Sequence, residues 1–267
     1  MRSLPRVPSR SPVELRGKRV LVTGASSGIG AAAAEKFAAQ GATVIVVARR
    51  AHLLNALVDR VTASGGHAIA IPTDLADLAA VDALVETVGQ VDILVNNAAR
   101  SIRRPVADSL ERWHDFERIM AINFYGQLRL IRGLVPGMLA RGDGHIINVS
   151  SWRVLPEASP LFSVYIASKA ALSAMSRIMD TEWEPRGVHS TTLYYPLVAT
   201  PMIAPTRAYD GLPALSSDEA ADWMITAART RPIRIAPRMA LAYRALDLVA
   251  PGVVNGIMQR QARKLGS

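Results

Sequence analysis

The chain has 267 residues and a formal charge of +9, and half of its residues are apolar, so it can bury a sizeable core. It contains no cysteine, which excludes disulfides, thiol nucleophiles and zinc–cysteine sites, and its five histidines show no spacing typical of metal ligands. The basic residues are scattered except at the two ends and accompany no nucleic-acid recognition motif, so we expect no nucleic-acid partner. Weak attraction to anionic lipid or to a phosphorylated substrate stays open.

The two ends differ in composition from the rest of the chain. Residues 1–14 are rich in Pro, Ser and Arg and predict a flexible N-terminal arm. They lack the apolar core of a signal peptide, and no apolar run reaches the roughly 20 residues of a membrane span, so we expect a cytoplasmic protein. The C-terminal VVNGIMQRQARKL, residues 253–265, predicts an amphipathic helix that lies either on a membrane surface or against protein.

Between the ends, short β-branched runs alternate with longer segments of helical periodicity. The runs that we predict as strands are residues 19–24, 42–48, 67–72, 92–97, 145–151 and 189–195. Continuous apolar strands joined by helices indicate a parallel sheet that is covered on both faces. We therefore predict one α/β domain over residues 15–267, a Rossmann-like doubly wound αβα sandwich with a parallel sheet of about seven strands.

Residues 200–236 interrupt this alternation after the sixth predicted strand. Prolines and a glycine open the segment, and Ser217 or Asp218 is then expected to cap a helix. Ligands of doubly wound folds bind beyond the carboxyl ends of the strands, so we place this excursion on the substrate side. Its apolar residues either form a lid over an acyl chain or simply pack on the domain: Met202, Ile203, Leu212, Leu215, Trp223 and Met224.

The stretch VLVTGASSGIG, residues 20–30, places glycines where the first predicted strand turns into the first helix. Glycine lets the backbone approach a pyrophosphate closely, and a helix N-terminus offers free N–H groups. We therefore predict dinucleotide binding rather than a turn without a ligand. The predicted contacts are Gly24, Ser26, Ser27, Gly28, Ile29 and Gly30.

The end of the second predicted strand bears on the choice of cofactor. No acid stands there to accept from a ribose 2′-hydroxyl, and Arg49 offers a fork of donors to a 2′-phosphate, so NADP(H) is favoured over NAD(H). Alternatively, Arg49 and Arg50 are solvated residues at the start of a helix. Asp74 and Leu75 follow the third strand as further cofactor contacts, and Asp74 is expected either to accept from the adenine amino group or to cap a helix that begins near Ala76.

Tyr165 and Lys169 stand four residues apart in a segment, 161–184, that is predicted to be helical, so they share one face of the helix. A free phenol has a pKa of about 10, and an adjacent ammonium group lowers it. The pair then serves as a general acid for carbonyl reduction or a general base for alcohol oxidation. Taken alone, it also fits a surface tyrosine beside a solvated lysine.

Five ordered motifs together resemble the short-chain dehydrogenase/reductase (SDR) family. They are TGASSGIG (23–30), NNAA (96–99), Asn123 within RIMAINFYGQ, NVSS (148–151) and YIASK (165–169). The resemblance implies that Tyr165 donates the proton to the carbonyl oxygen and that Lys169 lowers the pKa of this phenol and bonds the nicotinamide ribose. It further implies that a serine polarises the carbonyl and that Asn123 places a water in a proton relay.

The resemblance also assigns cofactor contacts elsewhere. Asn96 would bridge the central strands near the cofactor, and Ala98 would form a close backbone contact with it. After the sixth strand, PLVAT replaces the family's Pro-Gly-x-x-x-Thr, one residue shorter and without glycine. By this resemblance, Pro196 begins the stretch, the backbone of Val198 would bond the nicotinamide amide, and Thr200 would contact the phosphates.

The catalytic serine departs from the family spacing, because Ser151 lies one residue further from Tyr165 than expected. An insertion within residues 153–163 explains this shift without moving the strand end. Neighbouring strand residues point to opposite faces, so only one of Ser150 and Ser151 can face the nicotinamide. We predict that it is Ser151.

The part from YIASKAAL to RPIRIAPR is similar to the reductase domain of bacterial fatty acyl-CoA and fatty aldehyde reductases. This implies NADPH-dependent reduction of a fatty aldehyde, an acyl thioester or another apolar carbonyl substrate. The alternatives are a dehydrogenase of a sterol-like or other secondary alcohol and, from another class, a non-catalytic NADP(H)-binding sensor on the same fold. The family also implies a homodimer or homotetramer, formed through long helices predicted at about 109–140 and 161–184.

Overall fold

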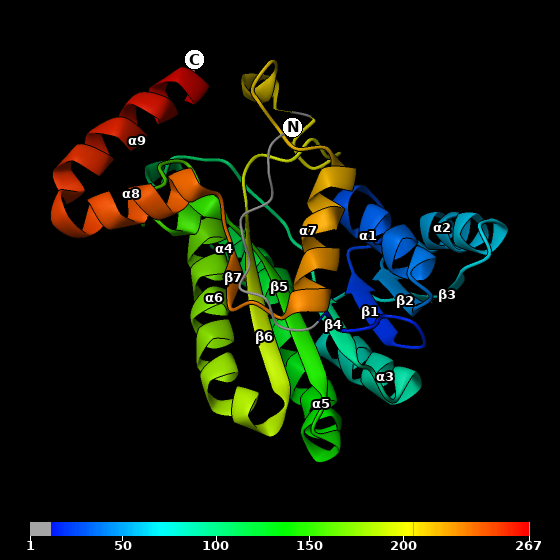
Figure 1. The fold of residues 1–267 in the computed structure, drawn as a ribbon. Coiled ribbons are helices and arrows are strands. Elements are labelled where there is room, and N and C mark those ends of the chain that lie inside the picture. The colour runs from blue at the N-terminus through cyan, green and yellow to red at the C-terminus, as the bar shows by residue number, and fades with distance from the viewer. Residues whose placement is uncertain (1–11, 205, 267) are drawn as a thin grey trace.

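Seven parallel strands form one sheet at the centre of the molecule (Figure 1). The computed structural model describes residues 12–204 and 206–266. The strands lie in the order β3-β2-β1-β4-β5-β6-β7. Their bounds are β1 Arg19–Thr23, β2 Thr43–Ala48, β3 His67–Pro72, β4 Ile93–Asn96, β5 Gly144–Ser151, β6 Val188–Tyr195 and β7 Arg234–Ile235. This is the predicted Rossmann-like doubly wound α/β fold.

The first six strands lie within one residue, at each end, of the ranges expected from the sequence. The agreement follows from burial on both faces, which requires an unbroken apolar or β-branched run; all eight residues of β6, for example, are buried. The location of β7 was missed because its two residues are too short to leave a pattern of their own.

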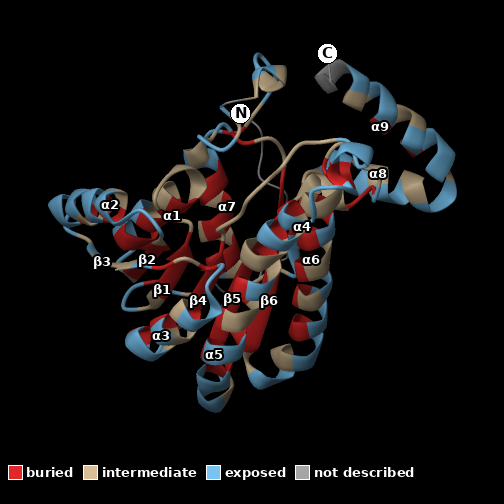
Figure 2. Cartoon of the chain, turned by 180° about the vertical axis from the view of Figure 1, so that it is seen from behind, coloured by how far each residue is buried: buried red, intermediate tan, exposed pale blue. Residues whose placement is uncertain are grey.

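Helices cover both faces of the sheet and give a three-layer αβα sandwich. Their bounds are α1 Gly28–Ala39, α2 Ala51–Ala63, α3 Leu78–Val88, α4 Trp113–Met120, α5 Gly126–Arg141, α6 Ser163–Trp183, α7 Ser217–Thr230, α8 Arg238–Val249 and α9 Pro251–Gly266. One hydrophobic core packs α1, α2 and α7 on one face, and a second packs α3, α5 and α6 on the other. Figure 2 shows the buried strands between these layers and the exposed outer surfaces of the helices.

The strand order reverses between β1 and β4, which lie side by side at the centre of the sheet. β2 and β3 follow on one side of β1, whereas β5, β6 and β7 follow on the other side of β4. At such a switch point the connections diverge and open a crevice beyond the carboxyl ends of the strands. The glycine turn follows β1 and the NNAA motif overlaps the end of β4, so both lie at this crevice.

The prediction of one long helix at 109–140 is wrong in its first part, because α4 begins only at Trp113. A 3₁₀ turn occupies Ala107–Ser109, and the helical path that follows is α4, a π-helical turn at Ala121–Tyr125, and α5. π-helical turns are rare and concentrate at functional sites, and this one contains Asn123. The helix predicted at 161–184 is confirmed as α6.

The predicted cap of α7 is wrong by one or two residues, because Ser216 caps this helix in place of Ser217 or Asp218. The Ser216 hydroxyl accepts from the Glu219 N–H at 3.0 Å, and the Glu219 carboxylate accepts from the Ser216 N–H at 2.7 Å. This reciprocal capping box satisfies the free donors at the start of the helix. Asp218 instead forms an ion pair with Lys36 of α1.

Asp74 does not cap a helix either. Its carboxylate accepts from the Ala76 N–H at 3.0 Å within a turn, and α3 begins only after Asp77. The Asp77 carboxylate accepts from the N–H groups of Ala79 and Ala80 and is therefore the cap. The carboxylate of Asp74 is thus directed to the turn that borders the crevice.

Of the predicted N-terminal arm, residues 1–11 lie outside the described residues. The Val13 N–H donates to the Arg229 carbonyl at 2.7 Å. At the other end, α9 spans the segment predicted as an amphipathic helix, and its Val254 and Met258 are buried, so part of its apolar side packs on this chain. Among the residues that the structure describes, no helix is both long and apolar enough to cross a membrane.

Candidate active site

A cleft of about 2030 Å³ lies beyond the carboxyl ends of the strands and contains most of the predicted site. The predicted residues that line it are Gly24, Ser26, Ser27, Gly28, Ile29, Arg49, Asp74, Leu75, Ala98, Ser151, Tyr165, Lys169, Pro196, Val198 and Thr200. Three predicted residues, Gly30, Asn96 and Asn123, do not line the cleft. Residues from β2, β5, β6 and α6, together with the loops that follow β1 and β4, thus converge on one cavity.

The glycine turn between β1 and α1 leaves no room for side chains. Gly24 has φ +68°, and a Cβ atom there would lie 2.8 Å from the Cα atom of Ala98. A Cβ atom on Gly30 would lie 2.5 Å from the Gly24 carbonyl oxygen. Ser27, the cap of α1, accepts no bond from the helix, so the first N–H groups of α1 stay available to an anion.

Thr200 lies against this turn from the opposite side of the cleft. A Cβ atom on Gly28 would lie 3.1 Å from the Thr200 methyl carbon. Val198 forms an isolated parallel bridge with Leu215, which fixes the short PLVAT segment beside the start of α7. The shortened loop therefore still brings Thr200 beside the glycine turn, and its contact with the phosphates stays a prediction.

Asn97 holds the turn in place, whereas Asn96 bridges the central strands as expected but does not line the cleft. The Asn97 side chain donates to the Thr23 carbonyl at 2.8 Å, and the Thr23 hydroxyl accepts from the N–H groups of Asn97 and Ala98. Asn96 is buried inside the sheet and donates to the Asn148 side chain at 2.9 Å, which ties β4 to β5. Because neighbouring strand residues point to opposite sides, only Asn97 of the pair reaches the cleft.

The end of β2 adds positive charge beside the glycine turn. Arg50 donates from Nη2 to the hydroxyls of Ser26 and Ser27, at 2.8 Å and 3.2 Å. Arg49 lies 4.0 Å from the Asp74 carboxylate and is largely exposed. Arg50, which the sequence had left as a solvated alternative, is thus the arginine in contact with the turn. Two guanidinium groups and two hydroxyls make a donor set that fits the 2′-phosphate of NADP(H).

Tyr165 and Lys169 stand on successive turns of α6, and both face the cleft. The Lys169 side chain is only 1% exposed, and its Nζ donates to the Val149 carbonyl of β5 at 2.7 Å. Burial lowers the pKa of Lys169 to about 7. Burial, together with the Tyr209 phenol nearby, raises the pKa of Tyr165 to about 12, and only Arg153 opposes this shift.

In this structure burial therefore dominates the pKa of the Tyr165 phenol, and Lys169 does not lower it as expected. The physical reason is that the amino group is directed to a backbone carbonyl and is itself desolvated, so its charged form is disfavoured. The two side chains nevertheless keep the predicted arrangement on one face of α6.

The two serines at the end of β5 have different environments. Ser150 is buried and accepts from the Ser173 hydroxyl of α6 at 3.0 Å. Ser151 is partly exposed, and its hydroxyl oxygen accepts from the Arg153 N–H at 3.3 Å. Both border the cleft, but of the two only the Ser151 hydroxyl bonds no side chain within the described part of the protein. This geometry agrees with Ser151 as the residue that contacts a substrate, which stays a prediction.

Asn123 is fully buried in the π-helical turn, and its side chain does not line the cleft. Its amide donates to the Arg100 carbonyl and the Ser168 hydroxyl, each at 3.0 Å, and its oxygen accepts from the Arg100 N–H at 2.8 Å. The side chain therefore clamps the loop after β4 to α6. Its predicted part in a water relay stays a prediction.

The excursion after β6 forms the apolar wall of the cleft. The predicted lid residues that line it are Met202, Ile203, Leu212, Leu215 and Trp223. The assignment of Met224 to the lid is wrong, because adjacent helix residues face different directions and Met224 is buried in the core beneath α7. Trp223 packs on the Tyr195 ring with centroids 5.3 Å apart, so it belongs both to the core and to the wall.

The loop 152–162, where the sequence indicated an extra residue, carries residues that the sequence had not singled out. The guanidinium of Arg153 lies over two aromatic rings, 5.3 Å from the centroid of Trp152 and 5.2 Å from that of Phe162. All three residues line the cleft. Leu161 has φ +74°, a conformation rare for a branched residue, as is common where loops border functional sites.

Comparisons with known proteins identify relatives of this chain. A model of the short chain dehydrogenase family matches residues 18–210. A fatty acyl-CoA reductase of Mycobacterium tuberculosis is 67% identical over 262 residues, which cover 97% of this chain and 89% of that protein. A fatty acyl-CoA reductase of Acinetobacter baylyi is 45% identical over 248 residues, which cover 91% of this chain and 84% of that protein.

Solved structures share the same architecture. The crystal structure of a 3-oxoacyl-(acyl-carrier-protein) reductase from Agrobacterium tumefaciens, with NADP bound, matches with a TM-score of 0.74 at 29% identity. The match covers 82% of this chain and 89% of that one. From the fold, the motifs and these relatives together, the chain belongs to the short-chain dehydrogenase/reductase family and is an oxidoreductase of that family.

Proposed function

We propose that this chain uses NADPH to reduce the carbonyl of a fatty aldehyde or fatty acyl thioester, with Tyr165 as the proton donor. The observation that carries the proposal is the single cleft that joins the glycine turn and Arg50 at one end to Tyr165 and an apolar wall at the other. The two relatives named above as fatty acyl-CoA reductases support the substrate class.

The cofactor end of the cleft supports NADP(H) over NAD(H). The donors of Arg49, Arg50, Ser26 and Ser27 would hold the 2′-phosphate, and the N-terminus of α1 would face the pyrophosphate. A carboxylate at the end of β2, which a free 2′-hydroxyl would call for, is absent from the sequence there. When bound, NADPH supplies the hydride.

At the other end, the phenol of Tyr165 is positioned to supply the proton. Its raised pKa keeps the hydroxyl protonated at neutral pH, so it is available to the carbonyl oxygen as negative charge develops there. The amino group of Lys169, with a pKa of about 7, changes protonation near neutral pH and suits a group that returns the proton to the phenol. The Ser151 hydroxyl would donate a second hydrogen bond to the same oxygen.

The apolar wall supports a substrate with a hydrocarbon chain. Met202 and Leu212 are about half exposed at the rim, where they are available to cover apolar surface, whereas Leu215 and Trp223 are anchored in the core. Burial of methylene groups stabilises binding by about 0.8 kcal/mol each, so a long chain gains affinity from such a wall. We expect short ketones and sterols to be poorer substrates.

We further propose a cytoplasmic homodimer or homotetramer in which residues 15–267 act as one domain. The outward face of α5 carries the exposed residues Arg132, Pro136 and Gly137, and the small size of Pro136 and Gly137 allows another helix to approach closely. Light scattering of the purified chain tests the assembly, and a monomer at micromolar concentration would contradict it.

The proposed reaction is tested by following NADPH oxidation with hexadecanal, hexadecanoyl-CoA, a short ketone and a sterol ketone. We expect turnover of one or both hexadecanoyl substrates, and a slower reaction when NADH replaces NADPH. Turnover of only the short or sterol ketone would reject the substrate class, and equal rates with NADH would reject the cofactor preference.

A further inference from the structure

Two arginines on the substrate side of the cleft have guanidinium groups that pair with no carboxylate among the described residues. Arg103 lies on the loop after β4, and Arg153 lies on the loop after β5; both line the cleft. The Nε and Nη2 atoms of Arg103 are buried and donate to no hydrogen-bond acceptor among the described residues. The guanidinium of Arg153 contacts the rings of Trp152 and Phe162 and forms no ion pair within the described part of the chain.

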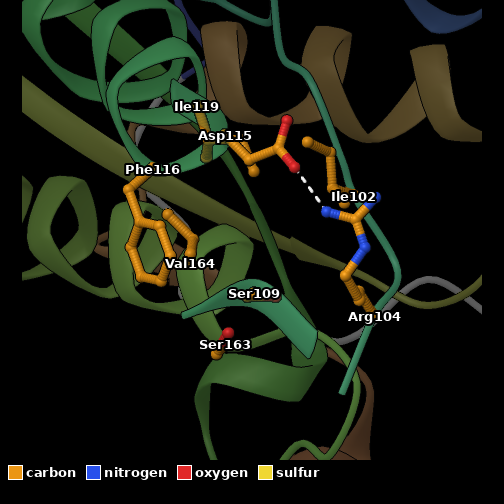
Figure 3. Close-up of a pocket in the computed structure, with 8 residues that line it drawn as sticks. All are labelled: Ile102, Arg104, Ser109, Asp115, Phe116, Ile119, Ser163 and Val164. Carbon is orange, nitrogen blue, oxygen red and sulfur yellow. Dashed lines mark hydrogen bonds and ion pairs between the residues drawn. The ribbon is translucent and has the colours of Figure 1, made fainter. Parts of the chain in front are cut away.

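The loop that carries Arg103 is fixed on both sides of this residue. At one end, the Asn123 side chain bonds both backbone groups of Arg100. At the other end, the Arg104 guanidinium pairs with the buried carboxylate of Asp115 on α4, as Figure 3 shows. The loop therefore presents Arg103 to the cleft in a defined position rather than as a freely moving surface side chain.

The same anchor joins the two loops to each other. The Arg104 N–H donates to the Leu161 carbonyl at 2.7 Å, so the loop after β4 is bound to the end of the loop that carries Arg153. Within the described part of the chain the buried Nε and Nη2 of Arg103 are not bonded to Asp115, whose carboxylate accepts from Arg104 and Arg112; these two bonds lower the pKa of Asp115 to about 2.

The electrostatic balance around the pair is unfavourable without an anion. Burial lowers the pKa of Arg153, the charge of Arg103 adds to this effect, and only the phenols of Tyr209 and Tyr165 oppose it. Two like charges that are partly removed from water and lack a carboxylate are costly unless a negative group joins them. Paired guanidinium forks match the planar oxygens of carboxylates and phosphates.

We propose that Arg103 and Arg153 form an oxyanion-binding subsite on the substrate side of the cleft, which holds a phosphate or carboxylate of the substrate. The subsite is separate from the cofactor end, where Arg49 and Arg50 follow β2. The inference rests on the proposed reductase function for the identity of the reacting group and adds to it that the substrate carries a negative charge. A phosphopantetheine thioester and an acyl chain with its own carboxylate share this chemistry.

Calorimetric titration of the full chain in the presence of NADP⁺ tests the subsite without turnover. The probes are two pairs that differ in the anionic group: 4′-phosphopantetheine against pantetheine, and dodecanoate against dodecanol. We expect at least one anion to bind about tenfold or more tightly than its neutral partner, because hydrogen bonds to charged groups are worth this much. Arg103→Gln and Arg153→Gln should abolish the preference. Arg118→Gln, which removes an exposed charge on α4, should retain it.

The arms of the titration separate the sources of the anion. A preference confined to phosphopantetheine supports a coenzyme thioester, and one confined to dodecanoate supports a carboxylate-bearing chain. Equal binding within both pairs, or an anion preference that survives in Arg103→Gln and Arg153→Gln, would overturn the proposal. Arg103→Lys keeps the positive charge but loses the paired donors of the guanidinium group, so it should retain part of the preference for the anion. This partial retention would show that the site still folds.

The result is also distinguishable from failure of the proposed function. Anion binding that depends on the two arginines in a chain without reductase activity would reject the reaction and support the subsite. Reductase activity in a chain whose arginine variants bind every probe like the wild type would reject the subsite and support the reaction.

Discussion

Replacement of Lys169 by methionine should stabilise the cofactor-free protein, and the gain should shrink as the pH rises. The side chain is 1% exposed, and burial lowers its pKa from 10.5 to about 7. Below pH 7 the folded and unfolded chains both hold the proton, and the folded protein bears the full cost of a buried charge. Between the two pKa values the unfolded chain holds a proton that the folded chain has released, so wild-type stability rises with pH.

The structure gives the size of this effect. Where the unfolded chain binds one proton more than the folded chain, the free energy of unfolding rises by about 1.4 kcal/mol per pH unit. From pH 7.5 to 9.5 the Lys169 contribution to wild-type stability therefore grows by about 2–3 kcal/mol, and Lys169→Met has no such contribution. The variant also loses the bond to the Val149 carbonyl, which offsets its gain similarly across this window because a neutral amine still donates.

Urea unfolding of both proteins without cofactor, at pH 7.5, 8.5 and 9.5, measures the difference. Other titrating groups are common to the two proteins and cancel when one free energy is subtracted from the other. We expect the advantage of the variant to fall steadily across the three pH values. A difference that stays constant would refute the account of Lys169 as a desolvated amine with a pKa near neutrality.

Three further substitutions test other parts of the site. Arg50→Ala should weaken NADPH binding about tenfold or more and leave NADH binding unchanged, because a charged hydrogen bond to phosphate is lost; equal losses would place Arg50 away from the 2′-phosphate. Ser151→Ala should reduce kcat far more than Ser150→Ala, and the reverse ranking would assign the substrate contact to Ser150. Gly24→Ala should lower Tm more than Gly65→Ala, since both have positive φ but only Gly24 meets backbone within 2.8 Å; equal shifts in calorimetry would show that the turn tolerates a side chain.

The parts of the fold that the sequence predicted are those with a local cause. The strand predicted at residues 67–72 has the same bounds as β3. A glycine pair precedes this run and a proline ends it, so the sequence itself marks both boundaries. The glycine turn was likewise predictable, since Gly24 and Gly30 have no room for a Cβ atom and only glycine fits.

The parts that the sequence did not predict depend on contacts between distant segments. The break between α4 and α5 accompanies Asn123, whose partners lie at Arg100 and Ser168. The direction of the Lys169 amino group is set by a carbonyl on β5, which no helical spacing reveals. Arg103 and Arg153 lie on separate loops that line one cleft and that are joined by the bond from the Arg104 N–H to the Leu161 carbonyl, so neither residue carries a local signal.

Tyr165→Phe, assayed by NADPH oxidation with hexadecanal and hexadecanoyl-CoA, tests the central claim most directly. The change removes one hydroxyl and keeps the ring that packs edge-on against Phe162. We predict that turnover falls by at least about 10²-fold, the lower range for loss of a general acid, while the NADPH dissociation constant stays the same. Turnover within a few-fold of the wild type would contradict the assignment of Tyr165 as the proton donor.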